Sequence, residues 1–367
     1  MTIHAADEPV GNPAPEQLGS TSTERTRPAR KHRVRRGILI ALLTLLGIVV
    51  VVGIVGSITP VPSAMLIRSV FEQGGDAAVR EMEPHVPDTP LREMLDVAYA
   101  DEGTPTTMDV FTTAEVGEVL PTVIWVHGGA WISGSKENVD PYLRILAAQG
   151  YTTIGVNYSL GPEEQYPTAV RQLNDALAYI DANATELGVD ATNLVLAGDS
   201  AGAQLASQLT TLITNDDYAQ LLGLKPALRQ NQLSGLILNC GVFDMRAMAE
   251  LEGLVAWGFQ VSLWAYTGTK DWSASAPGAT MSTLNFVNDG FPPTYISGGN
   301  GDGLTWLQSI PMSHALRDVG VDVTTLFWPM GHEPKLPHEY QFHLDTPEAQ
   351  QALDATIGYL AQVTAAR

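Results

Sequence analysis

Between about residues 91 and 363, short apolar runs alternate with longer segments in which apolar residues recur at helical spacing. The short runs predict strands, and the periodic segments predict helices that cover them. This alternation is typical of an α/β fold with a mostly parallel eight-stranded sheet and helices on both faces. The predicted strands are 94–100, 106–113, 121–126, 152–157, 193–197, 233–239, 294–297 and 321–328, and the predicted helices are 139–149, 168–187, 201–215, 306–319 and 347–363.

Ahead of this region, residues 37–59 form a run of 23 residues without a charge. As a helix the run is roughly 34 Å long at 1.5 Å per residue, which matches the apolar core of a bilayer. A cleaved signal peptide is the alternative, with small residues at Val55, Gly56 and Ser57 for the cut. The 36-residue leader and the length of the run favour an uncleaved transmembrane helix.

Residues 1–36 are rich in Pro, Ser, Thr and Ala, and they predict a disordered basic arm. The arm carries seven basic and four acidic residues, whereas Arg68 is the single basic residue in the first twenty after Thr59. This bias predicts a single-pass protein of the cell membrane with a cytoplasmic N-terminus and with the domain from residue 91 onward outside the cytoplasm. Residues 60–90 are then a juxtamembrane linker with one helix at 63–82, lying either on the membrane surface or against the domain that begins at residue 91.

The net charge and the cysteine content exclude some partners and some kinds of covalent stabilisation. The whole chain has a net charge of −20, so binding to a phosphate backbone is disfavoured and we expect no nucleic-acid partner. Cys240 is the single cysteine and cannot form an internal disulfide. The oligomeric state does not follow from the sequence.

Residues 193–209 read NLVLAGDSAGAQLASQL, a strand followed by GxSxG and a helix. This context is the one that a nucleophile elbow requires, with Gly198 and Gly202 where the turn leaves no room for side chains. Ser200 is the candidate nucleophile. The free N–H groups at the start of the helix point toward an oxyanion formed there. The alternative is a glycine-rich turn whose serine only caps the helix.

Residues 122–134 read TVIWVHGGAWISG, a strand that ends in HGGAW. The two glycines leave bare backbone N–H groups that suit an oxyanion hole. His127 lies beside the glycines, where it is better placed to brace this loop than to act as a base.

An acid and a base are expected after the nucleophile, in that order. Asp302 lies between two glycines in the loop after the strand at 294–297, and Asp244 competes for its role. His332 follows the last strand, and we predict it as the base. His338 and His343 follow closely, but Pro334 and Pro337 break the helix that a two-histidine zinc motif needs, so no metal is expected.

These landmarks, together with NYSLGPEEQYP at 157–167, resemble the α/β-hydrolases of the hormone-sensitive-lipase-like and bacterial carboxylesterase group. The HGGAW form is similar to the kynurenine-formamidase and feruloyl-esterase-like branch. The resemblance implies an α/β-hydrolase fold and a serine hydrolase that needs no cofactor and cleaves small-molecule acyl esters. It implies a triad of Ser200, Asp302 and His332 and an oxyanion hole formed by Gly128, Gly129 and Ala201.

The resemblance also implies a cap over the acyl pocket at 245–288, where most of the aromatic residues would form the cap's own core. Two alternatives stay open: an arylformamidase-like amide hydrolase, and a non-catalytic binding protein on a hydrolase fold, as in the gibberellin receptors and neuroligins. The acyl and alcohol groups of the substrate do not follow from the sequence.

Overall fold

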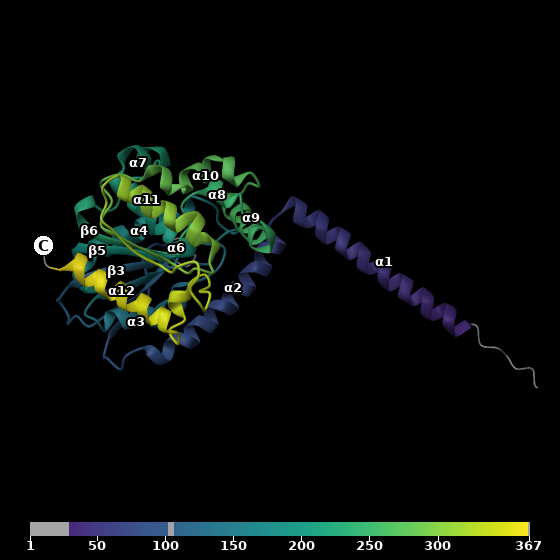
Figure 1. The fold of residues 1–367 in the computed structure, drawn as a ribbon, viewed down its shortest axis with the longest axis horizontal. Helices are drawn as coiled ribbons and strands as arrows, with labels where there is room; N and C mark the ends of the chain where they lie inside the picture. Colours follow the sequence, from purple (N-terminus) through teal and green to yellow (C-terminus); the bar gives the residue numbers. More distant parts are fainter. Residues whose placement is uncertain (1–28, 102–105, 366–367) are drawn as a thin grey trace, which may run out of the picture. The chain divides into compact units, whose positions relative to one another are not determined.

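The computed structural model describes residues 29–101 and 106–365 (Figure 1). The chain divides into two units between Val55 and Gly56, and we describe each by itself. Residues 1–28 of the predicted disordered arm lie outside the described residues, whereas its last eight residues, 29–36, are helical, so the prediction of disorder is wrong there.

The first unit is dominated by α1 (Ala29–Ile58). Its segment Val34–Ile58 spans 25 residues, and a window of 18 residues within it has a mean hydropathy of 3.2 with none of its residues buried in the protein. The predicted helix over 37–59 is confirmed. It is long and apolar enough to cross a membrane, and an N-terminal signal sequence would share these properties.

The second unit is built on one sheet of eight strands in the order β1-β2-β4-β3-β5-β6-β7-β8. The pairs β1–β2 and β2–β4 are antiparallel and every other pair is parallel, which confirms the predicted, mostly parallel sheet. All eight predicted strands are present. Their bounds are β1 (Arg92–Ala98), β2 (Thr107–Thr112), β3 (Leu120–Val126), β4 (Thr152–Val156), β5 (Val189–Asp199), β6 (Leu233–Asn239), β7 (Thr294–Gly298) and β8 (Val323–Phe327).

Helices cover both faces of this sheet (Figure 1). The α-helices of the second unit are α2 (Val61–Met82), α3 (Asp140–Ala147), α4 (Thr168–Ala182), α5 (Ala184–Leu187), α6 (Ser200–Thr214), α7 (Asp216–Leu222), α8 (Met245–Met248), α9 (Gly253–Thr267), α10 (Ala276–Met281), α11 (Ile310–Asp318) and α12 (Pro347–Thr364). Shorter turns are η1 (Glu83–His85), η2 (Lys136–Asn138), η3 (Gln230–Gln232), η4 (Trp272–Ala274), η5 (Thr283–Phe286), η6 (Thr305–Ser309) and η7 (Tyr340–Phe342).

The core follows the two-residue period of the strands. On β3, Ile124 and Val126 face a cluster with residues of α4, α6 and α11, whereas Val123 and Trp125 face a second cluster with residues of α3 and α12. Because both faces of the central strands are buried, these strands are apolar throughout rather than alternating.

The helix predicted at 63–82 is α2, and it packs against the domain. Ala64 and Ile67 are buried in a small cluster with residues of α9 and of the loop after β3. Arg68 pairs with Glu163 at 2.6 Å and donates to the carbonyl of Gly161 at 2.7 Å. Of the two expectations for this helix, the structure supports packing on the domain.

Candidate active site

The nucleophile elbow forms as predicted, at the point where β5 passes into α6. Ser200 adopts φ = +51°, a left-handed conformation that is uncommon for a residue other than glycine. The turn is tight: a Cβ at Gly202 would lie 2.0 Å from the carbonyl oxygen of Val126, and one at Gly198 would lie 2.5 Å from the backbone of Gly202. The glycines therefore let the helix approach the neighbouring strand and hold the hydroxyl at the carboxyl edge of the sheet.

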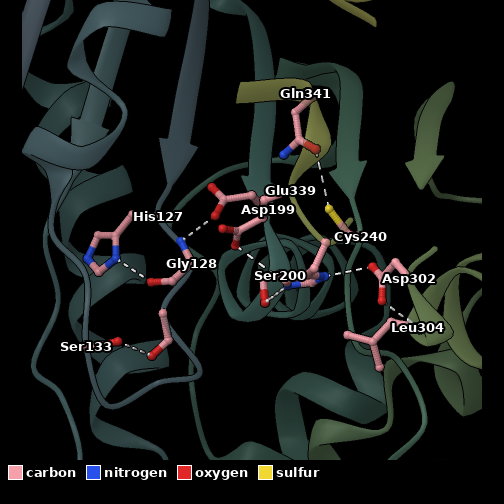
Figure 2. Close-up of polar contacts among 12 residues, drawn as sticks. His127, Gly128, Ser133, Asp199, Ser200, Cys240, Asp302, Leu304, Glu339 and Gln341 are labelled. Carbon is pink, nitrogen blue, oxygen red and sulfur yellow. Dashed lines mark hydrogen bonds and ion pairs between the residues drawn. The ribbon is translucent and has the colours of Figure 1, made fainter. Parts of the chain in front are cut away.

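His338 lies between Ser200 and Asp302 (Figure 2). The hydroxyl of Ser200 is 2.9 Å from Nε2 of His338, and Nδ1 donates to Oδ2 of Asp302 at 2.7 Å. The carboxylate is oriented in turn, because Oδ1 of Asp302 accepts from the amide of Leu304 at 2.9 Å. The hydroxyl, ring and carboxylate thus form one continuous chain of hydrogen bonds, as acyl transfer through a serine requires.

The prediction of His332 as the base is wrong in this geometry. Nε2 of His332 lies 2.9 Å from Oε1 of Glu348 on α12, and the ring packs on Trp328 at 4.5 Å between centroids. The loop after β8 continues past this histidine and turns back over the loop after β7. Asn300 fixes that path, since it donates to the carbonyl of His332 at 2.8 Å and accepts from the amide of Leu336 at 3.0 Å.

His338 could have been found from the loop rather than from the motif. Pro334 and Pro337 prevent a helix from starting after His332, so the loop stays extended for several more residues. The prolines that exclude a two-histidine zinc helix therefore also leave the chain free to bring His338 to Ser200.

The prediction of Asp302 over Asp244 as the partner of the histidine agrees with the contacts, although the histidine is a different one. Oδ1 of Asp244 accepts from the amide of Arg246 at 2.8 Å and so caps α8. An N-cap of this kind explains the aspartate at this position without a catalytic role.

His127 braces the loop after β3, as predicted. Its Nδ1 lies 2.8 Å from the carbonyl oxygen of Gly128, and its ring stacks on Tyr158 at 4.4 Å. Burial lowers the pKa of His127 to about 4, because the protonated ring would lose its hydration. The ring is therefore neutral at pH 7 and acts as a structural group.

The oxyanion prediction needs one correction, at Gly128. Its amide donates to Oδ2 of Asp199 at 2.9 Å, and a single N–H cannot also serve an oxyanion. Gly129 and Ala130 come next, and among the described residues none accepts a hydrogen bond from their amides. Ala130 adopts φ = +52° and lines the same cavity as Ser200, so it joins the candidate donors that the sequence missed.

A second carboxylate lies beside the histidine. Oε1 of Glu339 is 3.7 Å from Nε2 of His338, and Figure 2 shows Glu339 beside Asp199. Burial raises the pKa of Asp199 well above its usual value, and the charge of Glu339 raises it further. Burial disfavours the protonated imidazole of His338, but Asp302, Glu339 and Asp199 outweigh it and raise the pKa of His338 to about 9.

The three histidines that were considered for metal binding each contact the carboxylate of a different residue. His332 contacts Glu348, His338 contacts Asp302, and Nδ1 of His343 lies 2.8 Å from Glu81. One other set of potential ligand atoms, from Cys240, Asp302 and His338, lies within 4.8 Å of one another. Burial raises the pKa of the Cys240 thiol, which disfavours the thiolate that would bind a metal.

Two cavities adjoin His338, of which the smaller also adjoins Ser200, and both are lined by residues of α2 and α9. The first has a volume of about 360 Å³ and is lined by Ser200, the loop after β3, Glu339 and Phe71 of α2. The second has a volume of about 560 Å³ and extends from His338 between the two helices. The segment predicted as a cap at 245–288 forms α8 to α10. Tyr266 and Trp272 are buried, but in the main core of the domain rather than in a separate core of the cap, since Tyr266 stacks on Trp131 at 5.7 Å between centroids, and Trp257 is exposed. The sequence did not indicate that α2 would cover the same site.

The topology and the strand-turn-helix position of Ser200 define the α/β-hydrolase class of fold. The BD-FAE family model matches residues 108–316, more than half of the chain, and the chain belongs to this family. It is similar to the carboxylesterase NlhH of Mycobacterium tuberculosis, with 27% identity over 66% of this chain and 74% of NlhH. It is also similar to the esterase LipQ of the same organism, with 26% identity over 65% of this chain and 56% of LipQ, so the match spans little more than half of that relative.

Solved structures support the same fold. A crystal structure of esterase B from Lactobacillus rhamnosis, inhibited by a tributyrin phosphonate, superposes with a TM-score of 0.69 at 21% identity, covering 83% of this chain and 96% of that one. At this identity the superposition establishes the architecture alone. The α/β-hydrolase resemblance predicted from the sequence is confirmed.

Proposed function

We propose that this protein is a membrane-anchored serine hydrolase that cleaves carboxylic esters through an acyl-enzyme on Ser200. The observation that carries the proposal is the hydrogen-bond chain from the Ser200 hydroxyl through His338 to Asp302. The similarity of this chain to the carboxylesterase NlhH and the esterase LipQ supports the same reaction.

In the first half-reaction, Ser200 attacks the ester carbonyl while Nε2 of His338 takes the hydroxyl proton. The imidazolium then gives this proton to the departing alcohol, and the acyl group stays on Ser200 as an ester. In the second half-reaction, His338 takes a proton from water as the water oxygen attacks the acyl carbonyl. The bond from the acyl carbon to the Ser200 oxygen then breaks, the imidazolium returns its proton to that oxygen, and the free acid leaves. Asp302 holds Nδ1 protonated throughout, so Nε2 is free to accept.

The negative oxygen of each tetrahedral intermediate needs N–H donors. We assign this role to the amides of Gly129, Ala130 and Ala201, of which Gly129 and Ala201 were predicted from the sequence. Gly129 and Ala130 line the cavity that contains Ser200, and Ala201 is the first residue after it on α6. Such donors contribute about 3 to 4 kcal/mol each to stabilising the transition state.

The cavities support neutral, largely apolar substrates. No lysine or arginine lines either cavity among the described residues, and Glu339 places negative charge near Ser200. Carboxylic esters with uncharged acyl and alcohol groups therefore fit better than anionic ones. An aryl formamide is the second candidate substrate, because the HGGAW segment is similar to that of the kynurenine-formamidase branch.

A short p-nitrophenyl ester and the Ser200→Ala variant test the proposal on the full chain. We expect the variant to lose on the order of 10⁶ in kcat while its melting temperature stays within a few degrees of the wild type. A fluorophosphonate probe should label the wild type and leave Ser200→Ala unlabelled. If Ser200→Ala keeps a tenth of the activity, the nucleophile is wrong, and if the wild type cleaves neither esters nor aryl formamides, a binding role replaces the enzyme.

We also propose that α1 anchors the chain, with residues 1–36 as a basic cytoplasmic arm, 37–59 as the span and the catalytic domain from residue 91 outside the cell membrane. The uncharged run of 23 residues at 37–59 and the basic residues before it support this topology. In cells with opened outer wall layers, protease should degrade the catalytic domain and spare a tag placed before Arg25. A mature protein that begins after Ser57 would instead identify a cleaved signal.

A further inference from the structure

Six apolar side chains surround the opening of the larger cavity and are exposed. They come from α2 and α9, two helices that contact each other, and we call them the apolar rim. Their exposed fractions range from 41% for Trp257 to 80% for Leu254. The rim consists of Leu66, Val70 and Phe71 on α2 and Leu254, Val255 and Trp257 on α9.

The rim is continuous with the site. The cavity that it surrounds reaches His338 and Asp302 at its inner end, so a molecule that enters between α2 and α9 arrives at the reacting groups. An exposed apolar patch around a cavity of about 560 Å³ is unusual on a protein surface that faces water alone. Such a patch marks a surface that contacts another protein or a membrane when the protein functions.

The chain itself indicates what covers the rim. Thr59 and Pro60 are the two residues between the end of α1 and the start of α2, and Leu66 follows within two helical turns. Within the catalytic unit, Lys270, which follows α9, also donates to the carbonyl of Ser57. A fully extended link of three peptide units is about 10 Å long, so the first turns of α2 stay close to the surface at which the candidate span ends.

We propose that the apolar rim inserts into the bilayer surface next to the span, and that the acyl ester substrate enters the cavity from the membrane. This inference rests on the proposed function and adds a source of substrate to it. The chain after residue 36 carries a net charge of −23, which repels anionic headgroups, so zwitterionic phosphatidylcholine is the surface that fits.

Tryptophan fluorescence provides a test that does not depend on activity. All seven tryptophans follow residue 60, and the span contains none, so quenching by lipid reports on the catalytic domain alone. Trp257 on the rim and Trp306, which does not line the cavity, are similarly exposed, at 41% and 37%, whereas Trp125 and Trp131 are fully buried. Trp306→Phe is therefore a matched control for Trp257→Phe.

The full chain is reconstituted in phosphatidylcholine vesicles with bromine on the acyl chains. We expect quenching in the wild type and in Trp306→Phe, and loss of most of it in Trp257→Phe. Quenching that persists in Trp257→Phe overturns the proposal. Absence of quenching in the wild type also overturns the proposal. A second copy of the chain that covers the rim would explain such a result, and cross-linking of the Leu254→Cys variant would detect that copy.

A second measurement compares two substrates. The ratio of hydrolysis of a long-chain ester held in the vesicle to that of a water-soluble butyrate ester should fall about tenfold in Leu254→Ser, since one buried leucine is lost from the lipid contact. Leu221→Ser is the control, because Leu221 is 59% exposed and belongs to α7, a helix that lies apart from α2 and α9 in Figure 1. An unchanged ratio in Leu254→Ser overturns membrane entry, and absence of butyrate hydrolysis in the wild type would refute the proposed function instead.

Discussion

Two histidines six residues apart have different expected roles, and one pair of substitutions separates them. We consider His338→Gln and His332→Gln, because glutamine keeps a hydrogen-bond donor of similar reach but cannot take up a proton. Nε2 of His338 is 2.9 Å from the Ser200 hydroxyl, so His338→Gln removes the general base. Loss of the base from a serine triad costs on the order of 10⁶ in rate, or about 8 kcal/mol of transition-state stabilisation.

His332→Gln removes much less. The ring of His332 is 24% exposed and contacts Glu348 and Trp328, and glutamine can still donate to the carboxylate. The expected cost is about 1 kcal/mol of folding stability, a decrease of a few degrees in melting temperature, with kcat/KM within about twofold of the wild type.

The assay is hydrolysis of p-nitrophenyl butyrate by the two variants, with melting temperature as the control for folding. His338→Gln should be inactive and well folded, and His332→Gln should be active and slightly less stable. Comparable losses of activity in both variants would refute the assignment. An inactive His332→Gln beside an active His338→Gln would restore the role that the sequence motif suggested.

Three further predictions follow from the same contacts. Asp302→Asn should slow turnover about 10⁴-fold because Nδ1 of His338 loses its carboxylate acceptor. Asp244→Asn should change the melting temperature and leave turnover near that of the wild type. Equal losses of activity in the two variants would contradict the assignment of Asp302 alone as the partner of the histidine. The general base must be neutral, and the pKa of His338 is raised to about 9, so kcat/KM should rise with pH up to about 9. Glu339→Gln removes one of the charges that raise this pKa and should move the rise in kcat/KM to lower pH, toward the usual histidine value of about 6.5. A rise at an unchanged pH would exclude Glu339 as a cause of the raised pKa. Ile48→Arg should cost about 2.5 to 3.5 kcal/mol of membrane insertion and increase the fraction of the chain released by carbonate, and an unchanged membrane fraction would argue against a span centred there.

Much of the site could be predicted because its determinants are local. The elbow around Ser200 depends on a strand, two glycines and a helix in sequence, and the tight contacts at Gly198 and Gly202 explain why no other residues serve there. Asp302 follows similar logic, because the loops after parallel strands meet at one edge of the sheet. For the same reason the strands, the span-length helix and the cap were predicted at nearly their observed bounds.

The misassigned residues are those whose role depends on distant partners. Gly128 looks like an oxyanion donor in the sequence, but its amide is taken by Asp199, which lies 71 residues further along the chain. Ala130 has no functional group in its side chain, yet its backbone conformation brings it to the cavity. Neither fact has a signature in the local pattern.

The sequence by itself determined the class of fold, the order of the elements and the candidates for the nucleophile and the acid, because side-chain periodicity and steric limits on turns act over a few residues. Only the tertiary structure decided which histidine reaches the serine, which amides remain free and that α2 covers the site. These outcomes depend on loop paths fixed by contacts such as Asn300 with the loop after β8, and on packing between α2 and α9, which join residues far apart in the chain.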